Sequence, residues 1–295
     1  QRGCGRSKPS GELENNTTAH LVSDMEYIRT QLGINTWVIF GGSWGATLAL
    51  CYARDHADNV IHMILRGTFL GRQQDIDWVY AAGGASKLFP EAWHRLTHML
   101  DDAEQQRPLK AYYTRLTDPD ESLQLSAAAI LNSWEATIVT MRDHEYEADL
   151  TEAPGPLAHS RIQLHYALNQ CFIENRPILS EIDSLRHIPT HIIHGRYDIV
   201  CPLQQSWELH QAWPETSLTV LPLAGHAAGE PRRCTVHLRV PALRHADPGF
   251  DQHGGGDQNG DQSQRPGCHL RHAGHKIQAK IFFQRLGQTQ MPRQA

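Results

Sequence analysis

The sequence predicts an α/β fold, in which a mostly parallel sheet carries helices on both of its faces. Short apolar runs alternate along the chain with stretches of helical periodicity, which is the pattern of such folds. The apolar runs also lack the in-and-out alternation of strands that have one solvated face. At 295 residues, 40% of them hydrophobic, the chain can bury a large core. We therefore expect one large domain, with room for an insertion.

Charge and composition disfavour several classes of function. The net charge of −5 leaves no overall basic surface, so we expect no nucleic-acid partner. No apolar run is long enough to cross a bilayer, and the first residues show no signal-peptide stretch, so we expect no membrane partner and a cytoplasmic location. The six cysteines are irregularly spaced, which favours reduced thiols over disulfides or a metal site. None of these features sets the oligomeric state.

The first predicted elements are a helix and a buried strand. Thr17 or Thr18 can cap the N-terminus of the helix, and Gly33 can end it in a left-handed turn. A strand over 36–40 follows, apolar throughout, as expected of a strand that is buried on both faces and has a neighbour on each side. The apolar positions of the helix recur at helical spacing and are Leu21, Val22, Met25, Ile28 and Leu32.

The rest of the chain alternates in the same way around a long helical segment. We expect a helix over 46–56 and a strand over 60–65. Residues 71–187 then show helical patterns with polar connections and no clear strand, which indicates an inserted helical region. The later elements are strands over 190–194 and 217–221, with a helix over 204–213 between them.

A Gly-x-Ser-x-Gly motif joins the first strand to the second helix. It reads Gly41-Gly42-Ser43-Trp44-Gly45. Between a strand and a helix, this is the pattern of a nucleophile elbow, in which a strained turn exposes the serine hydroxyl at the helix N-terminus. The Trp44 backbone N–H would then donate to a developing oxyanion. An ordinary glycine-rich turn is the alternative, and the position between strand and helix disfavours it.

A serine nucleophile needs a histidine base and a carboxylate that orients the base, and the chain supplies both at later strand ends. Asp198 follows the strand over 190–194, and His226 follows the strand over 217–221. Taken singly, Asp198 could be a turn residue and His226 one of nineteen histidines. Together with Ser43 they indicate a triad whose members meet at one edge of a parallel sheet, in the order Ser, Asp, His of α/β-hydrolases.

The motifs together resemble those of the proline iminopeptidase (prolyl aminopeptidase) family of α/β-hydrolases, which remove an N-terminal proline from peptides. The likeness extends from residue 1 to about Pro231. It rests on Gln1-Arg2-Gly3-Cys4-Gly5-Arg6-Ser7, Asn16-Thr17-Thr18, the elbow Gly41 to Gly45, Leu65-Arg66-Gly67, Gly195-Arg196-Tyr197-Asp198 and Gly225-His226. The elbow and the Arg-Gly-Cys-Gly-Arg-Ser segment make the likeness more specific than the general hydrolase pattern.

The resemblance implies a role for each triad residue. Ser43 would be the nucleophile, His226 the base and then the acid, and Asp198 the carboxylate that orients His226. Trp44 would supply its backbone N–H to the oxyanion. The substrates would be peptides with an N-terminal proline, and neither a metal nor a cofactor is implied.

The resemblance also divides the chain. The first part of the hydrolase core, with the nucleophile elbow, would be 1–70, and the second part, with the acid and base loops, would be 188–231. A helical cap over 71–187 would cover the pocket. Residues 232–295, with ten Lys and Arg against four Asp, would be a disordered or out-of-frame tail. We hypothesise a shift of the coding frame near Glu230.

Family members bind the cationic N-terminus of the substrate with glutamates of the cap, because an imino cation that loses its hydration needs a carboxylate partner. Glu135, beside Trp134, matches one such position, and a solvated helix face is the alternative. Where a second glutamate would fall, this chain has Gln163, which accepts a hydrogen bond but supplies no charge. A broader selectivity is therefore tenable. Cys201 should pack near the pocket.

The chain departs from the family at its start. Members have early strands and a His-Gly-Gly-Pro-Gly-like loop before the segment at which this sequence begins, so we expect an N-terminally truncated hydrolase with its early strands missing. One of two backbone oxyanion donors would then be absent, a loss of about 3–4 kcal/mol of transition-state stabilisation that would impair activity. The bare edge of the first strand would be an aggregation hazard.

Three functions stay open at this point. The leading one is a serine aminopeptidase that releases N-terminal proline through an acyl-enzyme. A carboxylesterase or a broader aminopeptidase would use the same triad. An inactive hydrolase fragment would keep the fold without the chemistry, because this architecture hosts many functions.

Overall fold

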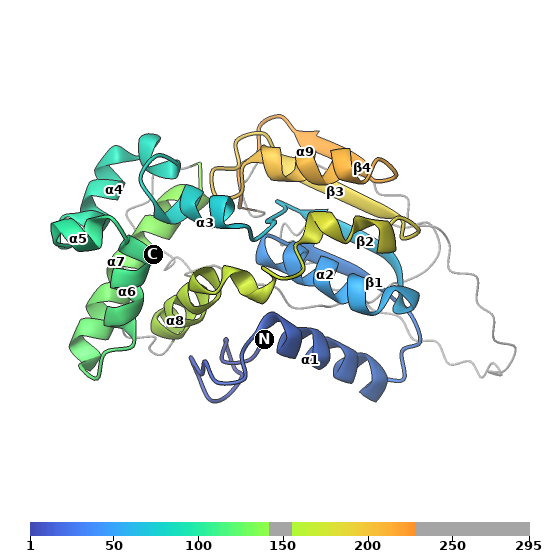
Figure 1. The fold of residues 1–295 in the computed structure, drawn as a ribbon, viewed down its shortest axis with the longest axis horizontal. Coiled ribbons are helices and arrows are strands. Elements are labelled where there is room, and N and C mark those ends of the chain that lie inside the picture. Colours follow the sequence, from blue (N-terminus) through green and yellow to red (C-terminus); the bar gives the residue numbers. More distant parts are fainter. Residues whose placement is uncertain (142–154, 228–295) are drawn as a thin grey trace, which may run out of the picture. The chain divides into compact units, whose positions relative to one another are not determined.

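The computed structural model describes residues 1–141 and 155–227. Within these ranges one sheet has the strand order β1-β2-β3-β4, and each neighbouring pair is parallel (Figure 1). The strands are β1 (Trp37–Gly42), β2 (Val60–Arg66), β3 (Thr190–Gly195) and β4 (Ser217–Leu221). The parallel sheet with intervening helices confirms the predicted α/β class.

The described α-helices include those predicted over 46–56 and 204–213, within two residues at each end, and several in the segment over 71–187, for which no individual bounds were predicted. They are α1 (Thr18–Gln31), α2 (Trp44–Asp55), α3 (Gln73–Tyr80), α4 (Pro90–Thr97), α5 (Asp102–Gln105), α6 (Pro108–Leu116), α7 (Glu121–Val139), α8 (Gly155–Leu168) and α9 (Leu203–Ala212). The predicted tail over 232–295 lies outside the described residues, and so does part of the segment predicted to be helical.

Helix α1 begins and ends as the sequence predicts. The Thr17 hydroxyl accepts a hydrogen bond from the His20 backbone N–H, and Gly33 has a φ of 64° after the last turn. The expected apolar stripe is only half buried, however. Leu21 and Met25 join the main core. Ile28 and Leu32, near the end of the helix, are 51% and 66% exposed. Within the described residues the core therefore does not extend to the last turns of α1.

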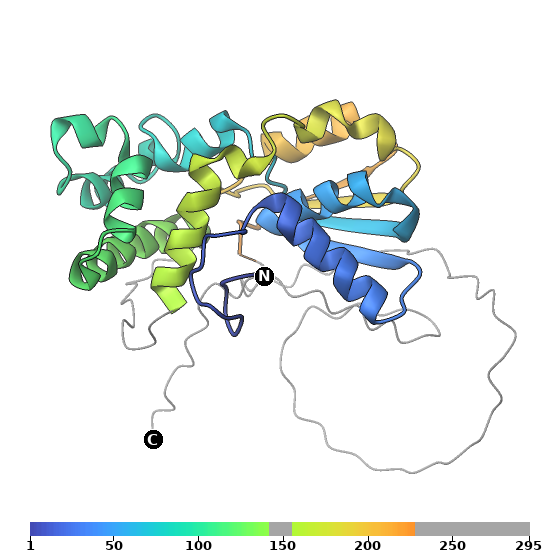
Figure 2. The same ribbon diagram turned by 60° about the horizontal axis from the view of Figure 1, so that its bottom comes forward.

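One core cluster joins the sheet to α1, α2 and α9. Alternate strand residues such as Ile39, Met63 and Ile192 point into it and are fully buried. Helices α1 and α2 pack side by side in this layer (Figures 1 and 2). The sheet and these helices therefore form the support from which the strand ends project.

Strand β1 is at the edge of the sheet within the described residues. It pairs with β2 from Trp37 to Gly42, and Phe40 is 42% exposed. Within the described ranges β1 therefore has a partner strand on one side only.

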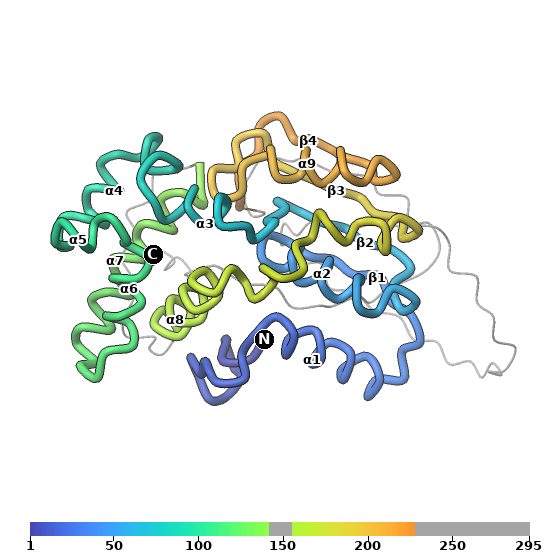
Figure 3. The backbone as a smooth tube through the Cα atoms, in the orientation of Figure 1, coloured from blue at the N-terminus to red at the C-terminus, as the bar shows by residue number. Residues whose placement is uncertain are grey.

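The chain leaves the sheet after β2, passes through α3 to α8 and returns to β3 (Figure 3). Buried residues of this segment, among them Ile76, Leu131 and Leu164, form a second core cluster, in which α6, α7 and α8 pack against one another. Helix α8 contributes to both clusters, because its Ile162 and Tyr166 belong to the core of the sheet. Buried residues after α8, such as Cys171 and Ile188, also join the core of the sheet. No strand occurs in the described part of this segment, as the sequence predicts.

Candidate active site

Ser43 occupies the sharp turn between β1 and α2. Its φ of 56° and ψ of −126° are unusual for a residue with a side chain, and its backbone N–H donates to the Arg66 carbonyl oxygen at 2.8 Å. The turn requires a glycine at position 41, where a Cβ would collide with the Gly45 carbonyl group. The geometry places the Ser43 hydroxyl at the N-terminus of α2, as the elbow motif predicts.

The ends of β3 and β4 bring Asp198 and His226 to Ser43. Ser43 Oγ lies 3.1 Å from His226 Nε2, and His226 Nδ1 lies 2.8 Å from Asp198 Oδ2. Because a carboxylate only accepts, Nδ1 carries the proton and donates to Asp198, which leaves Nε2 free to accept from the Ser43 hydroxyl. Asp198 and His226 are 5% and 4% exposed, so this relay is shielded from water.

The environment of Asp198 keeps its carboxylate ionised. Burial alone would raise the pKa of Asp198, but the charge of His226 and hydrogen bonds from His194 and His226 outweigh burial and hold that pKa well below its usual value. The Cys201 backbone N–H also donates to Asp198 Oδ1 at 2.8 Å. The carboxylate is therefore an anion at neutral pH, as an orienting residue must be.

Arg66 connects the nucleophile turn to the histidine loop. Its carbonyl oxygen accepts from the Ser43 N–H, and its partly buried guanidinium donates to the His226 carbonyl oxygen. Burial lowers the pKa of Arg66, although the neighbouring Asp198 opposes this. Sequence reasoning assigned Arg66 no role. A charged residue at the end of a buried strand was the feature of the sequence that could have pointed to it.

Trp44 begins α2 directly after the nucleophile. A backbone N–H at the first helical position has no carbonyl partner within its helix, so it is available to an oxyanion. The Trp44 ring packs edge-on against Tyr166 of α8, with the ring centroids 4.8 Å apart. Helix α8 therefore contacts the residue adjacent to the nucleophile.

A second polar cluster lies between α3, α7 and α8. Glu135, on α7, is 6% exposed, which excludes a solvated helix face. Its Oε1 accepts from the Tyr80 hydroxyl at 2.8 Å, and Gln163 Nε2 donates to that same hydroxyl at 2.7 Å. His159 Nε2 lies 3.4 Å from Glu135 Oε2. The structure thus joins the two residues predicted to bind substrate through Tyr80, which sequence reasoning missed.

This Glu135 cluster, made of Glu135, Tyr80, Gln163 and His159, holds two buried polar atoms that make no hydrogen bond. Gln163 Oε1 and His159 Nε2 are buried and make no hydrogen bond. Burial, with the carboxylate of Glu135, raises the pKa of Tyr80 well above its usual value, so the phenol stays protonated and donates. Gln163 and Tyr166 are one turn apart on α8, which puts the cluster next to the residue that packs on Trp44.

Comparison with known proteins identifies the relatives of this chain. The model of the alpha/beta hydrolase fold family matches residues 1–231. Proline iminopeptidase from Xylella fastidiosa (strain Temecula1 / ATCC 700964) is 44% identical over 234 residues, which cover 79% of this chain and 74% of the relative. Proline iminopeptidase from Xanthomonas citri is 42% identical over 252 residues, which cover 85% of this chain and 78% of the relative.

The chain belongs to the proline iminopeptidase family of α/β-hydrolases. The resemblance that its motifs predict is thereby confirmed. Among solved structures, an alpha/beta fold family hydrolase from Bacillus anthracis str. Sterne matches with a TM-score of 0.47 and 22% identity, over 76% of this chain and 73% of that one.

In this member of the proline iminopeptidase family, Cys201 lies beside Ser43. Its Sγ is 3.9 Å from Ser43 Oγ, and the side chain is 1% exposed. Burial raises the pKa of the Cys201 thiol well above its usual value, so the sulfur is a neutral thiol. Cys201 therefore packs beside the hydroxyl without competing for its proton, in agreement with the predicted position near the pocket.

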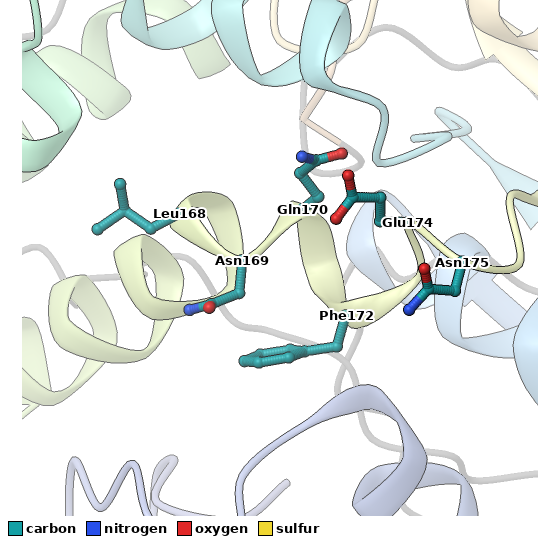
Figure 4. A pocket seen from close by; sticks show the side chains of 6 residues that line it. All are labelled: Leu168, Asn169, Gln170, Phe172, Glu174 and Asn175. Carbon is teal, nitrogen blue, oxygen red and sulfur yellow. The ribbon is translucent and has the colours of Figure 1, made fainter.

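A cavity of about 370 Å³ lies at the turn after α8 and contains none of the triad residues. Figure 4 shows its lining: Leu168, Asn169, Gln170, Phe172, Glu174 and Asn175. Three successive residues of this turn, Gln170, Cys171 and Phe172, have φ values between 45° and 55°. We assign this cavity no function.

No group of three or more His, Cys, Asp or Glu side chains in residues 1–141 and 155–227 could hold a metal ion. No helix of these ranges is long and apolar enough to span a membrane. The four cysteines of the described ranges are free thiols.

Proposed function

We propose that this protein is a serine aminopeptidase that releases N-terminal proline from peptides through an acyl-enzyme. One observation carries the proposal: two hydrogen bonds in series connect Ser43 to His226 and His226 to Asp198, at 3.1 and 2.8 Å. A serine in such a relay is activated as a nucleophile. The sequence likeness to proline iminopeptidases supports the choice of substrate.

The first half-reaction transfers the prolyl group to the enzyme. Ser43 Oγ attacks the carbonyl carbon of the N-terminal residue while His226 Nε2 takes the hydroxyl proton. The tetrahedral oxyanion would accept a hydrogen bond from the Trp44 backbone N–H. When the intermediate collapses, the scissile C–N bond breaks, and His226 gives its proton to the leaving amine.

The second half-reaction restores the enzyme. His226 removes a proton from a water molecule that attacks the acyl carbon, and the C–O bond to Ser43 then breaks. Ser43 recovers its proton from His226, and free proline leaves. Throughout the cycle Asp198 stays ionised and stabilises the imidazolium that forms twice.

The Glu135 cluster is our proposed site for the cationic end of the substrate. Glu135 supplies a buried carboxylate, and Gln163 supplies an oxygen that has no hydrogen-bond donor. An imino cation offers N–H donors and a positive charge, so it would satisfy both groups. Residues 71–187 would then act as a cap that places this cluster over the triad.

The decisive experiment compares an amide with an ester. The protein should hydrolyse a proline aryl amide faster than a short-chain aryl ester, and acylation of the imino nitrogen should abolish amide turnover. A fluorophosphonate should label the full chain but not Ser43→Ala. A faster ester reaction that is insensitive to blocking of the amine would contradict the peptidase proposal, and absent labelling would indicate an inactive hydrolase.

Gln163 favours a second candidate, an aminopeptidase of broader selectivity. With one carboxylate instead of two, the site attracts a cation less strongly and discriminates less between amino-terminal residues. Rates on proline, alanine and leucine aryl amides would separate the two candidates. Rates within tenfold of one another would establish the broader enzyme.

The proposal includes a cytoplasmic location. It rests on the irregular cysteine spacing, which favours a reducing compartment. Fractionation of cells that express the protein would test it.

A further inference from the structure

Asp198 has a second histidine beside it. His194, the second-last residue of strand β3, is completely buried. Its Nε2 lies 2.7 Å from the Cys201 carbonyl oxygen and 3.3 Å from Asp198 Oδ2. Its Nδ1 lies 2.6 Å from Ser206 Oγ, on α9. The proposed mechanism uses neither His194 nor Ser206.

The partners of His194 fix its hydrogens. A carbonyl oxygen only accepts, so Nε2 carries a proton and points it between Cys201 and Asp198. The Ser206 hydroxyl, which is fully buried, can donate to Nδ1. Both ring nitrogens are thus held, and the ring cannot turn without losing two buried hydrogen bonds.

His194 and His226 approach the same oxygen of Asp198. Oδ2 receives the His226 Nδ1–H at 2.8 Å and faces His194 Nε2 at 3.3 Å. The other ionisable groups that act here are the Arg66 guanidinium, which interacts with Asp198, and the Cys201 thiol, which also interacts with Asp75. A donor at His194 withdraws negative charge from the oxygen that orients the catalytic base.

We propose that His194 is a positioning residue of the catalytic relay, which fixes the Asp198 carboxylate through its Nε2–H. This inference rests on the proposed hydrolytic function. It extends the relay inward to Ser43, His226, Asp198, His194 and Ser206. Loss of the donor leaves more negative charge on Asp198 Oδ2, which favours the protonated form of His226. His226 then becomes protonated at a higher pH, and below that pH it cannot act as a base.

The test is the pH profile of two variants of the full chain. His194→Phe keeps the ring and removes the donor, whereas His194→Gln keeps an N–H near the position of Nε2. For His194→Phe we expect kcat on proline aryl amide to fall about 10- to 100-fold with little change in KM, and the acidic limb of kcat/KM to move to higher pH. His194→Gln should keep most of the wild-type kcat and an acidic limb close to that of the wild type.

A second buried histidine provides the matched control. His62, on the neighbouring strand β2, is 2% exposed and its ring nitrogens make no hydrogen bond, so His62→Phe should leave the acidic limb unchanged. A purely structural role for His194 would lower the yield of active enzyme without moving the limb. The proposal is overturned if the limb of His194→Phe coincides with that of the wild type, or if His194→Gln loses as much as His194→Phe.

Two further measurements keep the inference separate from the proposed substrate. The rate at which a fluorophosphonate labels Ser43 depends on the same base, so its pH profile should shift in the same direction even if proline amides are not hydrolysed. Should His194→Phe fail to fold, Ser206→Ala, which leaves Nδ1 without a donor, should shift the limb by a smaller amount in the same direction. An unshifted limb in Ser206→Ala, or no labelling of the wild type, would refute the proposal.

Discussion

The triad and the Glu135 cluster are both buried polar sites, but only the triad is complete. Asp198 and His226 have partners at both of their side-chain polar atoms. In the Glu135 cluster, Gln163 Oε1 and His159 Nε2 are buried without a hydrogen bond. A buried polar group without a hydrogen bond typically lowers the stability of the folded protein by about 1–3 kcal/mol. A ligand that forms the missing hydrogen bond would recover this free energy. The contrast supports the proposed division between a triad that does the chemistry and a cluster that binds the substrate.

This contrast has a kinetic consequence. Groups that act only on the transition state change kcat, whereas groups that bind the amino end of the substrate change KM. Variants of the triad and variants of the cluster should therefore separate along these two parameters, and the ester, which has no amine, should respond only to the triad.

The largest effect is expected for Asp198→Asn. The amide cannot stabilise the imidazolium and favours the wrong tautomer of His226, so kcat should fall about 10⁴-fold while KM changes little. Steady-state kinetics on proline aryl amide and on an aryl ester should show the same loss. An equal rise in KM would show that the two regions are not functionally separate.

Glu135→Gln should cause the next largest effect. Removal of the only carboxylate of the cluster should lower kcat/KM for proline aryl amide roughly 10- to 100-fold, mainly through KM. Ester hydrolysis should be unaffected. Glu121→Gln, on the exposed start of the same helix α7, is the control and should match the wild type on both substrates. A parallel loss on amide and ester would place Glu135 in a structural role.

Tyr80→Phe tests the link within the cluster. The phenol donates to Glu135 and accepts from Gln163, so its loss frees both side chains to move. Loss of one hydrogen bond to the Glu135 carboxylate and one from the neutral Gln163 amide should raise KM about fivefold, with kcat preserved. Tyr27→Phe, on α1 and 64% exposed, serves as the control. A fall in kcat with an unchanged KM would argue against a recognition role for Tyr80.

The smallest effect is expected for Gln163→Glu. A second carboxylate strengthens the attraction for a cation but loses the donor to the Tyr80 hydroxyl, so the amide-to-ester rate ratio should rise only about threefold. Gln163→Leu, which has no oxygen, should lower that ratio. If both variants change the ratio in the same direction, the charge at this position does not determine selectivity.

The sequence was sufficient to predict that Ser43, Asp198 and His226 lie together, but not what surrounds them. Ser43, Asp198 and His226 follow strands, and parallel strands carry their C-terminal ends to one edge of the sheet, so chain order and strand position were informative. His194 lies within a mostly apolar strand, and the strand pattern does not predict its contacts with Cys201, Asp198 and Ser206. Its role depends on a turn of the acid loop that no periodicity encodes.

The cluster shows the same limit in a helical region. Tyr80 and Glu135 are 55 residues apart, and Tyr80 and Gln163 are 83 apart. Helical periodicity predicts which residues share a face of one helix, but it carries no information on which helices meet. The likeness to a family pointed to Glu135 and Gln163, while Tyr80 and His159 became visible only in the packing of α3, α7 and α8.

The backbone at Ser43 makes the nucleophile a burden on the folded state. A residue with a side chain at φ 56° and ψ −126° is strained by about 1–3 kcal/mol, and glycine at that position would be relieved of it. The proposed activity and the stability of the fold therefore place opposite demands on residue 43. Ser43→Gly should raise the melting temperature while removing the hydroxyl on which hydrolysis depends.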